Sequence, residues 1–184
     1  YSEDLDFMWI NPQSEVDLKK WTGTLAKPFS GSEIRVHVDK KGPEKVDAIV
    51  EKRSATIYFV AISDAFRTFA REGLQISFEI DLNPPSHFEK ESVSMAVANT
   101  TVQIPSLTLP SLMAGKLHIL LTRKDREKGR DWFDYVWYRE RQVSPNVRQL
   151  ASAIAQTSQG PDAQYWMSYL RERTSKVNWD NVRG

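Results

Sequence analysis

The sequence has no cysteine in its 184 residues, which excludes disulfide bonds, thiolate catalysis and cysteine-ligated zinc sites. Glycine and proline are also few, at 8 and 9 residues, so collagen-like and low-complexity chains are excluded as well. No apolar run approaches the roughly 20 residues that a membrane-spanning helix needs. We therefore expect a folded globular protein without a membrane partner, and a cytoplasmic location is the simplest expectation.

A surplus of charge of one sign is missing too. The 25 Lys and Arg residues nearly balance the 24 Asp and Glu residues, which leaves a formal net charge of +1. A strongly basic chain would indicate nucleic acid as a partner. This balance neither requires nor excludes such a partner, because a local basic patch can exist within a neutral total.

The pattern of the chain changes near Pro105. Residues 1–105 mix strand-like alternation with short helical stretches, and residues 106–184 carry helical periodicity only. The sequence therefore predicts an α+β fold: a mixed-sheet core over residues 1–105, followed by an all-helical region over residues 106–184 that is either separate or shares the same core.

Alternation of apolar and polar residues predicts the strands, and capping residues with helical spacing predict the helices. Strands are expected at about residues 5–10, 34–38, 55–62 and 74–82, with one bent or two short strands within 92–104. Helices are expected at about residues 14–27, 66–72, 110–124, 128–141, 145–156 and 162–176. Residues 40–43, Lys-Lys-Gly-Pro, are expected to form a turn.

Two pairs of acidic residues lie at alternate positions on predicted strands. Asp4 and Asp6 begin the first strand, and Glu79 and Asp81 lie within the strand 74–82. Residues i and i+2 share a strand face, and carboxylates held together repel each other unless a cation lies between them. Magnesium prefers such ligands. Solvated strand faces would produce the same patterns, and the alternation of Phe78, Ile80 and Leu82 with the acids fits that alternative.

Charged residues also lie at helical spacing in the second half. Lys116 and Arg123 are seven residues apart and share a helix face, where they could hold phosphate groups. Asp131 and Asp134 share a face of the next helix, within the segment Lys128-Gly129-Arg130-Asp131-Trp132-Phe133-Asp134. Taken alone, each pattern is explained better by a solvated helix face. His118 has no second histidine at ligand spacing, so we expect a structural role for it.

These segments, in this order, resemble the AbiEii/AbiGii-type nucleotidyltransferase toxins of the DNA polymerase β-like superfamily. Residues 2–7 resemble the end of that family's first motif, in which D-x-D follows a Gly-rich stretch. Residues 79–85 resemble the strand with the third acid, residues 116–123 the lysine-bearing helix, and residues 128–134 the K-G-R-D-x-x-D helix. The Gly-rich stretch would lie before Tyr1, so we expect either a fragment or a numbering that covers only the ordered residues of a longer protein.

The resemblance implies transfer of a nucleotidyl group from an NTP to an acceptor, with Mg²⁺. It implies metal binding by Asp4, Asp6 and Glu79, with Glu79 a better match than Asp81 to the third acid. Lys116 would meet phosphate charge, and Asp131 would orient Lys116 or the acceptor. Arg123 and Lys128 are expected to bind substrate.

The resemblance also implies a biological context and partners. The protein would be the toxin of a toxin–antitoxin or phage-abortive-infection pair, with a cognate antitoxin, and with tRNA or another RNA as a candidate acceptor. Two alternatives remain open. One is a catalytically silent partner that binds an antitoxin or RNA, and the other is a metal-dependent nuclease, which also uses strand carboxylates and a lysine.

Overall fold

The computed structural model describes residues 4–10, 20–21, 23–24, 27–31, 34–46, 50–61, 74–97, 99–123, 128–157 and 160–182. The chain divides into two compact units, Tyr1–Pro84 and Pro85–Gly184. The predicted helix 66–72 and most of the predicted helix 14–27 lie outside the described residues.

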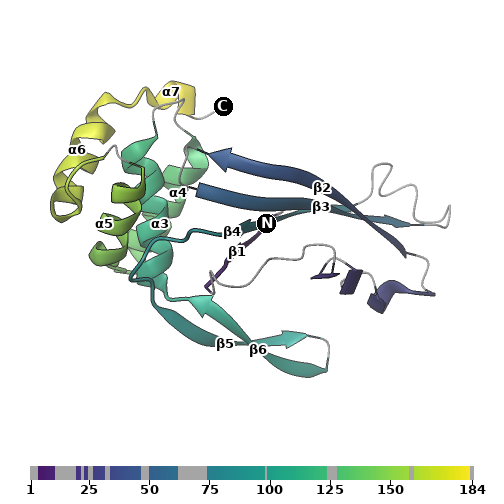
Figure 1. The fold of residues 1–184 in the computed structure, drawn as a ribbon. Helices are drawn as coiled ribbons and strands as arrows, with labels where there is room; N and C mark the ends of the chain where they lie inside the picture. Colours follow the sequence, from purple (N-terminus) through teal and green to yellow (C-terminus); the bar gives the residue numbers. More distant parts are fainter. Residues whose placement is uncertain are drawn as a thin grey trace. The chain divides into compact units, whose positions relative to one another are not determined.

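The first unit contains a four-stranded mixed sheet in the order β1-β4-β3-β2 (Figure 1). Its elements, with a short 3₁₀ helix η1, are β1 (Asp4–Met8), η1 (Lys27–Phe29), β2 (Ile34–Val46), β3 (Val50–Ala61) and β4 (Leu74–Asp81). Strand β1 pairs with β4 in parallel, whereas β4 with β3 and β3 with β2 are antiparallel. Among the described strands, β1 therefore lies at one edge of the sheet, next to β4.

Alternation along the strands gives this sheet one apolar face. Ile57, Phe78 and Ile80 form its buried core, and partly buried apolar side chains pack against them. Phe7 of β1 joins this face, because its ring centroid lies 4.9 Å from that of Phe78. The polar residues that alternate with these side chains lie on the opposite face of the sheet.

The expected turn at residues 40–43 is wrong. Strand β2 continues through these residues to Val46, and the β2–β3 register shifts between Lys41 and Glu44. Gly42 and Pro43 form this irregularity. Proline lacks a backbone N–H and is accommodated in a sheet at a bulge, so Gly-Pro here interrupts the pairing without ending the strand.

The second unit combines a two-stranded antiparallel sheet with helices (Figure 1). Its elements are β5 (Lys90–Val97), β6 (Thr100–Leu107), α3 (Leu109–Thr122), α4 (Gly129–Glu140), α5 (Val147–Gln156), η2 (Ala163–Tyr165), α6 (Trp166–Lys176) and α7 (Trp179–Val182). Pro110 lies in the first turn of α3, where its missing N–H costs no hydrogen bond. The Asn146 side chain caps α5 by accepting a hydrogen bond from the Gln149 N–H.

One apolar core holds the helices of the second unit together. Leu117 and Leu120 of α3 are buried with Trp132 of α4, Leu150 of α5 and Leu170 of α6. Because α3 contributes four of these buried apolar residues (Met113, Ala114, Leu117 and Leu120), it is the central helix of the unit.

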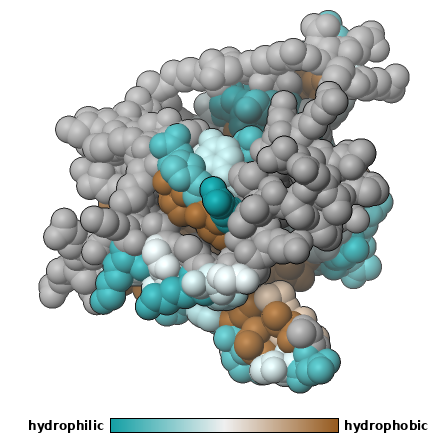
Figure 2. All heavy atoms as spheres, turned by 90° about the vertical axis from the view of Figure 1, so that its right-hand side faces the viewer, coloured by the Kyte–Doolittle hydropathy of each residue, from teal (hydrophilic) through white to brown (hydrophobic). Residues whose placement is uncertain are grey.

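The β5–β6 hairpin has one apolar and one polar face. Val93 pairs with Ile104 and Met95 with Val102, and all four side chains are exposed. They contribute to the brown surface at the lower edge of Figure 2. On the polar face, the Gln103 side chain forms hydrogen bonds with the hydroxyl groups of its neighbouring serines.

The α+β class predicted from the sequence is confirmed, and so are the strand 74–82, the pair of strands within 92–104 and the four helices after residue 108. The hairpin belongs to the same unit as these helices. A separate all-helical region starting at residue 106 therefore stays a prediction. None of the described helices combines the length and apolar character needed to cross a membrane.

Central α3 provides a test of this core. Leu117 is 0% exposed, whereas Leu112 on the same helix is 38% exposed. Leu117→Ala should lower the free energy of unfolding by about 3 kcal/mol, since it removes buried contacts and leaves a cavity. Leu112→Ala should cost about 0.5 kcal/mol or less. Urea denaturation measures both, and similar losses would contradict the central position of α3.

Candidate functional site

The polar face of the four-stranded sheet carries the predicted acidic residues. Strand pairing places Asp6 directly beside Glu79, and Asp4 beside Ser77. Residues in register on paired strands share a face, so Asp4, Asp6 and Glu79 lie on the same side of the sheet. We call this side the acidic face. Neighbouring strands are about 4.8 Å apart, which brings the backbones that carry Asp6 and Glu79 close together.

Asp81, the alternative third acid, has a local structural contact. Its carboxylate accepts a hydrogen bond of 2.9 Å from the Asn83 N–H, and its backbone carbonyl accepts one of 2.8 Å from the Trp9 N–H. The side-chain contact is typical of a turn stabilised by an aspartate. Asp81 therefore takes part in the turn that ends β4, and its register partner on β1 is Met8 rather than an acid.

Ser54 extends the acidic face onto a third strand. It lies on β3 directly opposite Glu79, and it is one of the few buried polar residues of the described chain. Its hydroxyl oxygen has no hydrogen-bond partner. The sequence prediction missed this residue, because the strand was expected to begin at Ala55. The available signal in the sequence was a polar residue directly before a predicted apolar strand.

The donors on the acidic face fit magnesium by their chemistry. They are carboxylate oxygens, with a hydroxyl beside them, and Mg²⁺ prefers hard oxygen ligands supplied by one or two carboxylates and substrate phosphates. Among the residues that the structure describes, no three His, Asp or Glu side chains are gathered closely enough to form a complete metal site. The pairing of β1 with β4 brings two acids together, and Asp4 lies one alternate position further along.

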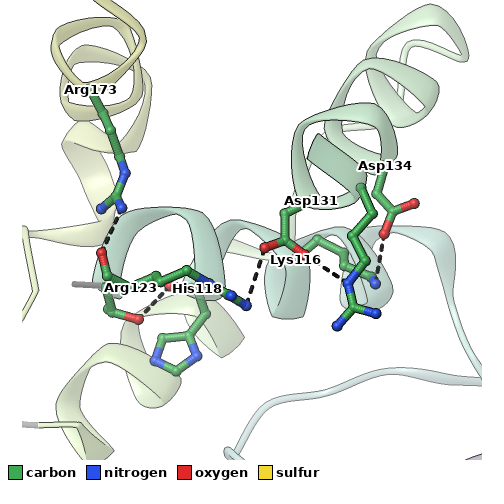
Figure 3. Close-up of polar contacts among 8 residues, drawn as sticks. Lys116, His118, Arg123, Asp131, Asp134 and Arg173 are labelled. Carbon is green, nitrogen blue, oxygen red and sulfur yellow. Dashed lines mark hydrogen bonds and ion pairs between the residues drawn. The ribbon is translucent and has the colours of Figure 1, made fainter. Parts of the chain in front are cut away.

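In the second unit, two ion pairs connect α3 with α4 (Figure 3). Lys116 Nζ lies 2.7 Å from Asp134 Oδ2, and Arg123 Nη2 lies 3.2 Å from Asp131 Oδ2. Lys116 precedes Arg123 along the chain, whereas the partner of Lys116 follows the partner of Arg123. This is the arrangement expected when helices joined by a short connection run antiparallel.

The two ion pairs differ in their exposure to water. The Lys116 and Asp134 side chains are 42% and 34% exposed, whereas those of Arg123 and Asp131 are 20% and 7% exposed. Arg130 adds a second, longer contact of 3.9 Å to Asp131. Asp131 also lies in the first turn of α4, where the helix dipole favours a carboxylate. The buried Asp131 carboxylate is thus balanced by two guanidinium groups and a helix N-terminus.

This pairing differs from the expectation that Asp131 would contact Lys116. Asp134 is the direct ion-pair partner of Lys116, and the ion-pair partners of Asp131 are arginines. Both aspartates lie on the α4 face that was predicted to carry them, and the axial position of α4 against α3 places Asp134 beside Lys116 and Asp131 beside Arg123. The spacing of residues within one helix does not show how far α4 is shifted along the axis of α3.

The remaining predicted residues surround these pairs. Lys128 is exposed at the residue before α4 begins. Arg173 of α6 donates a hydrogen bond to the backbone carbonyl of Arg123, which fixes the end of α3 (Figure 3). Burial lowers the pKa of His118, so this side chain adds no positive charge beside the pairs at neutral pH.

A family model described as the nucleotidyl transferase AbiEii toxin of type IV toxin–antitoxin systems matches residues 1–181. The chain belongs to the AbiEii family. The family resemblance stated from the sequence motifs is therefore confirmed. Membership makes the chain a nucleotidyltransferase toxin by family, and it implies a nucleotide substrate and a cognate antitoxin. Comparisons with curated proteins and with solved structures find no significant match.

The unequal burial of the two ion pairs predicts unequal effects on stability. Asp131→Asn should lower the free energy of unfolding by about 2 kcal/mol, because it leaves the Arg123 guanidinium largely buried without its counter-charge. Asp134→Asn should cost less than about 1 kcal/mol, since its pair with Lys116 is partly solvated. Chemical denaturation at neutral pH compares the two variants. Equal costs would show that Asp131 does not anchor α4 to α3.

Proposed function

We propose that this AbiEii-family protein transfers a nucleotidyl group from an NTP to a hydroxyl of an acceptor, with magnesium held on the acidic face. The observation that carries the proposal is the placement of Asp6 beside Glu79, with Asp4 on the same face. The acceptor hydroxyl would lose its proton to solvent as its oxygen forms a bond to the α-phosphorus. The bond between the α-phosphorus and the oxygen that bridges it to the β-phosphorus would break, and pyrophosphate would leave.

Asp4, Asp6 and Glu79 are the proposed metal ligands. Glu79 is favoured over Asp81 because it is the register partner of Asp6, whereas the Asp81 carboxylate accepts the Asn83 N–H in the turn that ends β4. Magnesium, when bound, neutralises triphosphate charge and makes the attacking hydroxyl more acidic. The role of the three side chains is to fix that charge on one face of a rigid sheet.

Lys116 is the proposed phosphate-binding residue. Asp134 holds its ammonium group at 2.7 Å, yet the side chain remains 42% exposed and so accessible to an anion. An ammonium group is a compact, strongly hydrated charge that suits phosphate oxygens. The ion pair would direct the lysine before substrate arrives, so that less side-chain entropy is lost on binding.

Asp131 is the proposed positioning residue for the arginine beside it. Its contacts with Arg123 and Arg130 orient two guanidinium groups, which are suited to bidentate phosphate binding. Arg123 and the exposed Lys128 are the proposed substrate-binding residues. We propose an RNA, with tRNA included, as the acceptor, because an RNA presents both the hydroxyl nucleophile and the phosphate charge that these cations would bind.

The metal assignment predicts a loss of transfer in Asp6→Ala. The metal ligand keeps in place positive charge that stabilises the transition state. Its removal should lower turnover by at least about 100-fold without unfolding the protein. Transfer of label from α-³²P NTPs to total RNA measures the effect, and circular dichroism checks the fold.

Asp39→Ala is the matched control for this experiment. Asp39 is an exposed strand acid on the same sheet face, but it lies on β2, three strands from β1 and therefore about 14 Å away. It should retain activity. Shortening of the RNA without NTP would favour the nuclease alternative. If the RNA is neither labelled nor shortened, the alternative of a catalytically silent binding partner is favoured.

The phosphate assignment predicts that Lys116→Ala raises the KM for NTP by about tenfold or more, because a charge-assisted contact is lost. Lys176→Ala is the control, since Lys176 is also an ion-paired helical lysine, with Glu172 as its partner on the exposed surface of α6. Steady-state kinetics with varied NTP compares them. The same KM in both variants would make Lys116 an ordinary surface residue.

A further inference from the structure

Ser54 lies in the interior of the four-stranded sheet with an unsatisfied hydroxyl group. The residue is 6% exposed, and its Oγ has no hydrogen-bond partner. Buried hydroxyl groups in proteins are almost always hydrogen-bonded, because leaving one without a partner forfeits the bonds it would make to water. An exception of this kind requires an explanation, such as a role in binding.

The contrast with Ser111 shows that burial alone does not leave a serine unsatisfied in this protein. Ser111 is 0% exposed, and its hydroxyl accepts a hydrogen bond of 2.8 Å from the Glu89 N–H. The two serines are similarly buried, one in each unit. Buried polar atoms of Thr108 and Gln149 in the second unit also lack a partner, so what distinguishes Ser54 is its position in register with Glu79.

Register places Ser54 in a row with two of the proposed metal ligands. Ser54 on β3 is directly opposite Glu79 on β4, and Glu79 is directly beside Asp6 on β1. All three side chains lie on the same face of the sheet. Opposed residues on antiparallel strands have Cβ atoms about 5 Å apart, which is within reach of a hydrogen bond between a serine and a glutamate side chain.

We propose that Ser54 is a positioning residue for Glu79: when the site holds its cation, the Ser54 hydroxyl donates a hydrogen bond to the Glu79 carboxylate and fixes its orientation. This inference rests on the proposed function. A carboxylate has several lone pairs, so it can bind a cation through one oxygen and accept a hydroxyl hydrogen bond at the other. Partners that orient metal ligands in this way tune metal affinity in many proteins.

Ser54→Ala separates this role from a structural one, because the two readouts move in opposite directions. Without metal and nucleotide, the variant should melt about 2 to 4 °C higher, since it removes an unsatisfied buried group. The Mg²⁺ concentration for half-maximal NTP transfer should rise about tenfold. The increase in melting temperature that Mg²⁺ gives the wild-type protein should be smaller in the variant.

Two further variants complete the experiment. Ser111→Ala should lower the melting temperature and leave the Mg²⁺ dependence unchanged, because it removes a satisfied hydrogen bond within the second unit, which carries none of the proposed metal ligands. Ser54→Thr keeps the hydroxyl group and should retain a Mg²⁺ dependence close to that of the wild type. A rescue by threonine would assign the effect to the hydroxyl rather than to the volume of the side chain.

The outcomes distinguish this inference from the proposed function. If the wild-type protein responds to Mg²⁺ and transfers nucleotides, and Ser54→Ala has the same Mg²⁺ dependence in both assays, Ser54 does not position Glu79 and the inference alone is overturned. If the wild-type protein shows neither a Mg²⁺-dependent melting shift nor transfer, the proposed function is overturned and the inference with it.

Discussion

The parallel pairing of β1 with β4 is the constraint on which the candidate site depends. Among the described strands, β1 lies at one edge of the sheet, and its register with β4 alone brings Asp6 beside Glu79. A slip of one residue would turn Asp6 to the apolar face and Phe7 to the acidic face. The contact of Phe7 with Phe78 opposes that slip. Apolar packing on one face of the sheet thus fixes the position of the charges on the other.

The buried acid of the second unit has its counter-charges within that unit. Asp131 is acceptable in the interior since Arg123, Arg130 and the first turn of α4 balance it. Gly129 supports this arrangement, as a Cβ at that position would lie 2.7 Å from the carbonyl oxygen of Val182. The glycine and the aspartate of the K-G-R-D segment therefore both have packing roles, whatever they contribute to chemistry.

Local patterns in the sequence predict most of the described elements but not the contacts between them. Alternation around Glu79 predicts its strand and its face, and the spacing of Lys116 and Arg123 predicts a shared helix face. The partner of Lys116 depends on the axial offset of two helices, and the neighbour of Ser54 depends on strand register. Both are long-range quantities set by the packing of many side chains. The bulge at Gly42 was missed for a related reason, since a Gly-Pro pair has the same local signature in a turn as in an interrupted strand.

The two units differ in how their described charged residues are arranged. The described part of the helical unit pairs opposite charges, whereas the acidic face gathers carboxylates of like charge beside a buried hydroxyl that has no partner. Natural sequences tend to be locally consistent except where function requires otherwise. A buried hydroxyl without a hydrogen-bond partner lowers the stability of the sheet when nothing is bound. In the proposed site, a bound cation would orient Glu79 to accept a hydrogen bond from that hydroxyl, which is the physical reason to locate the chemistry on the acidic face.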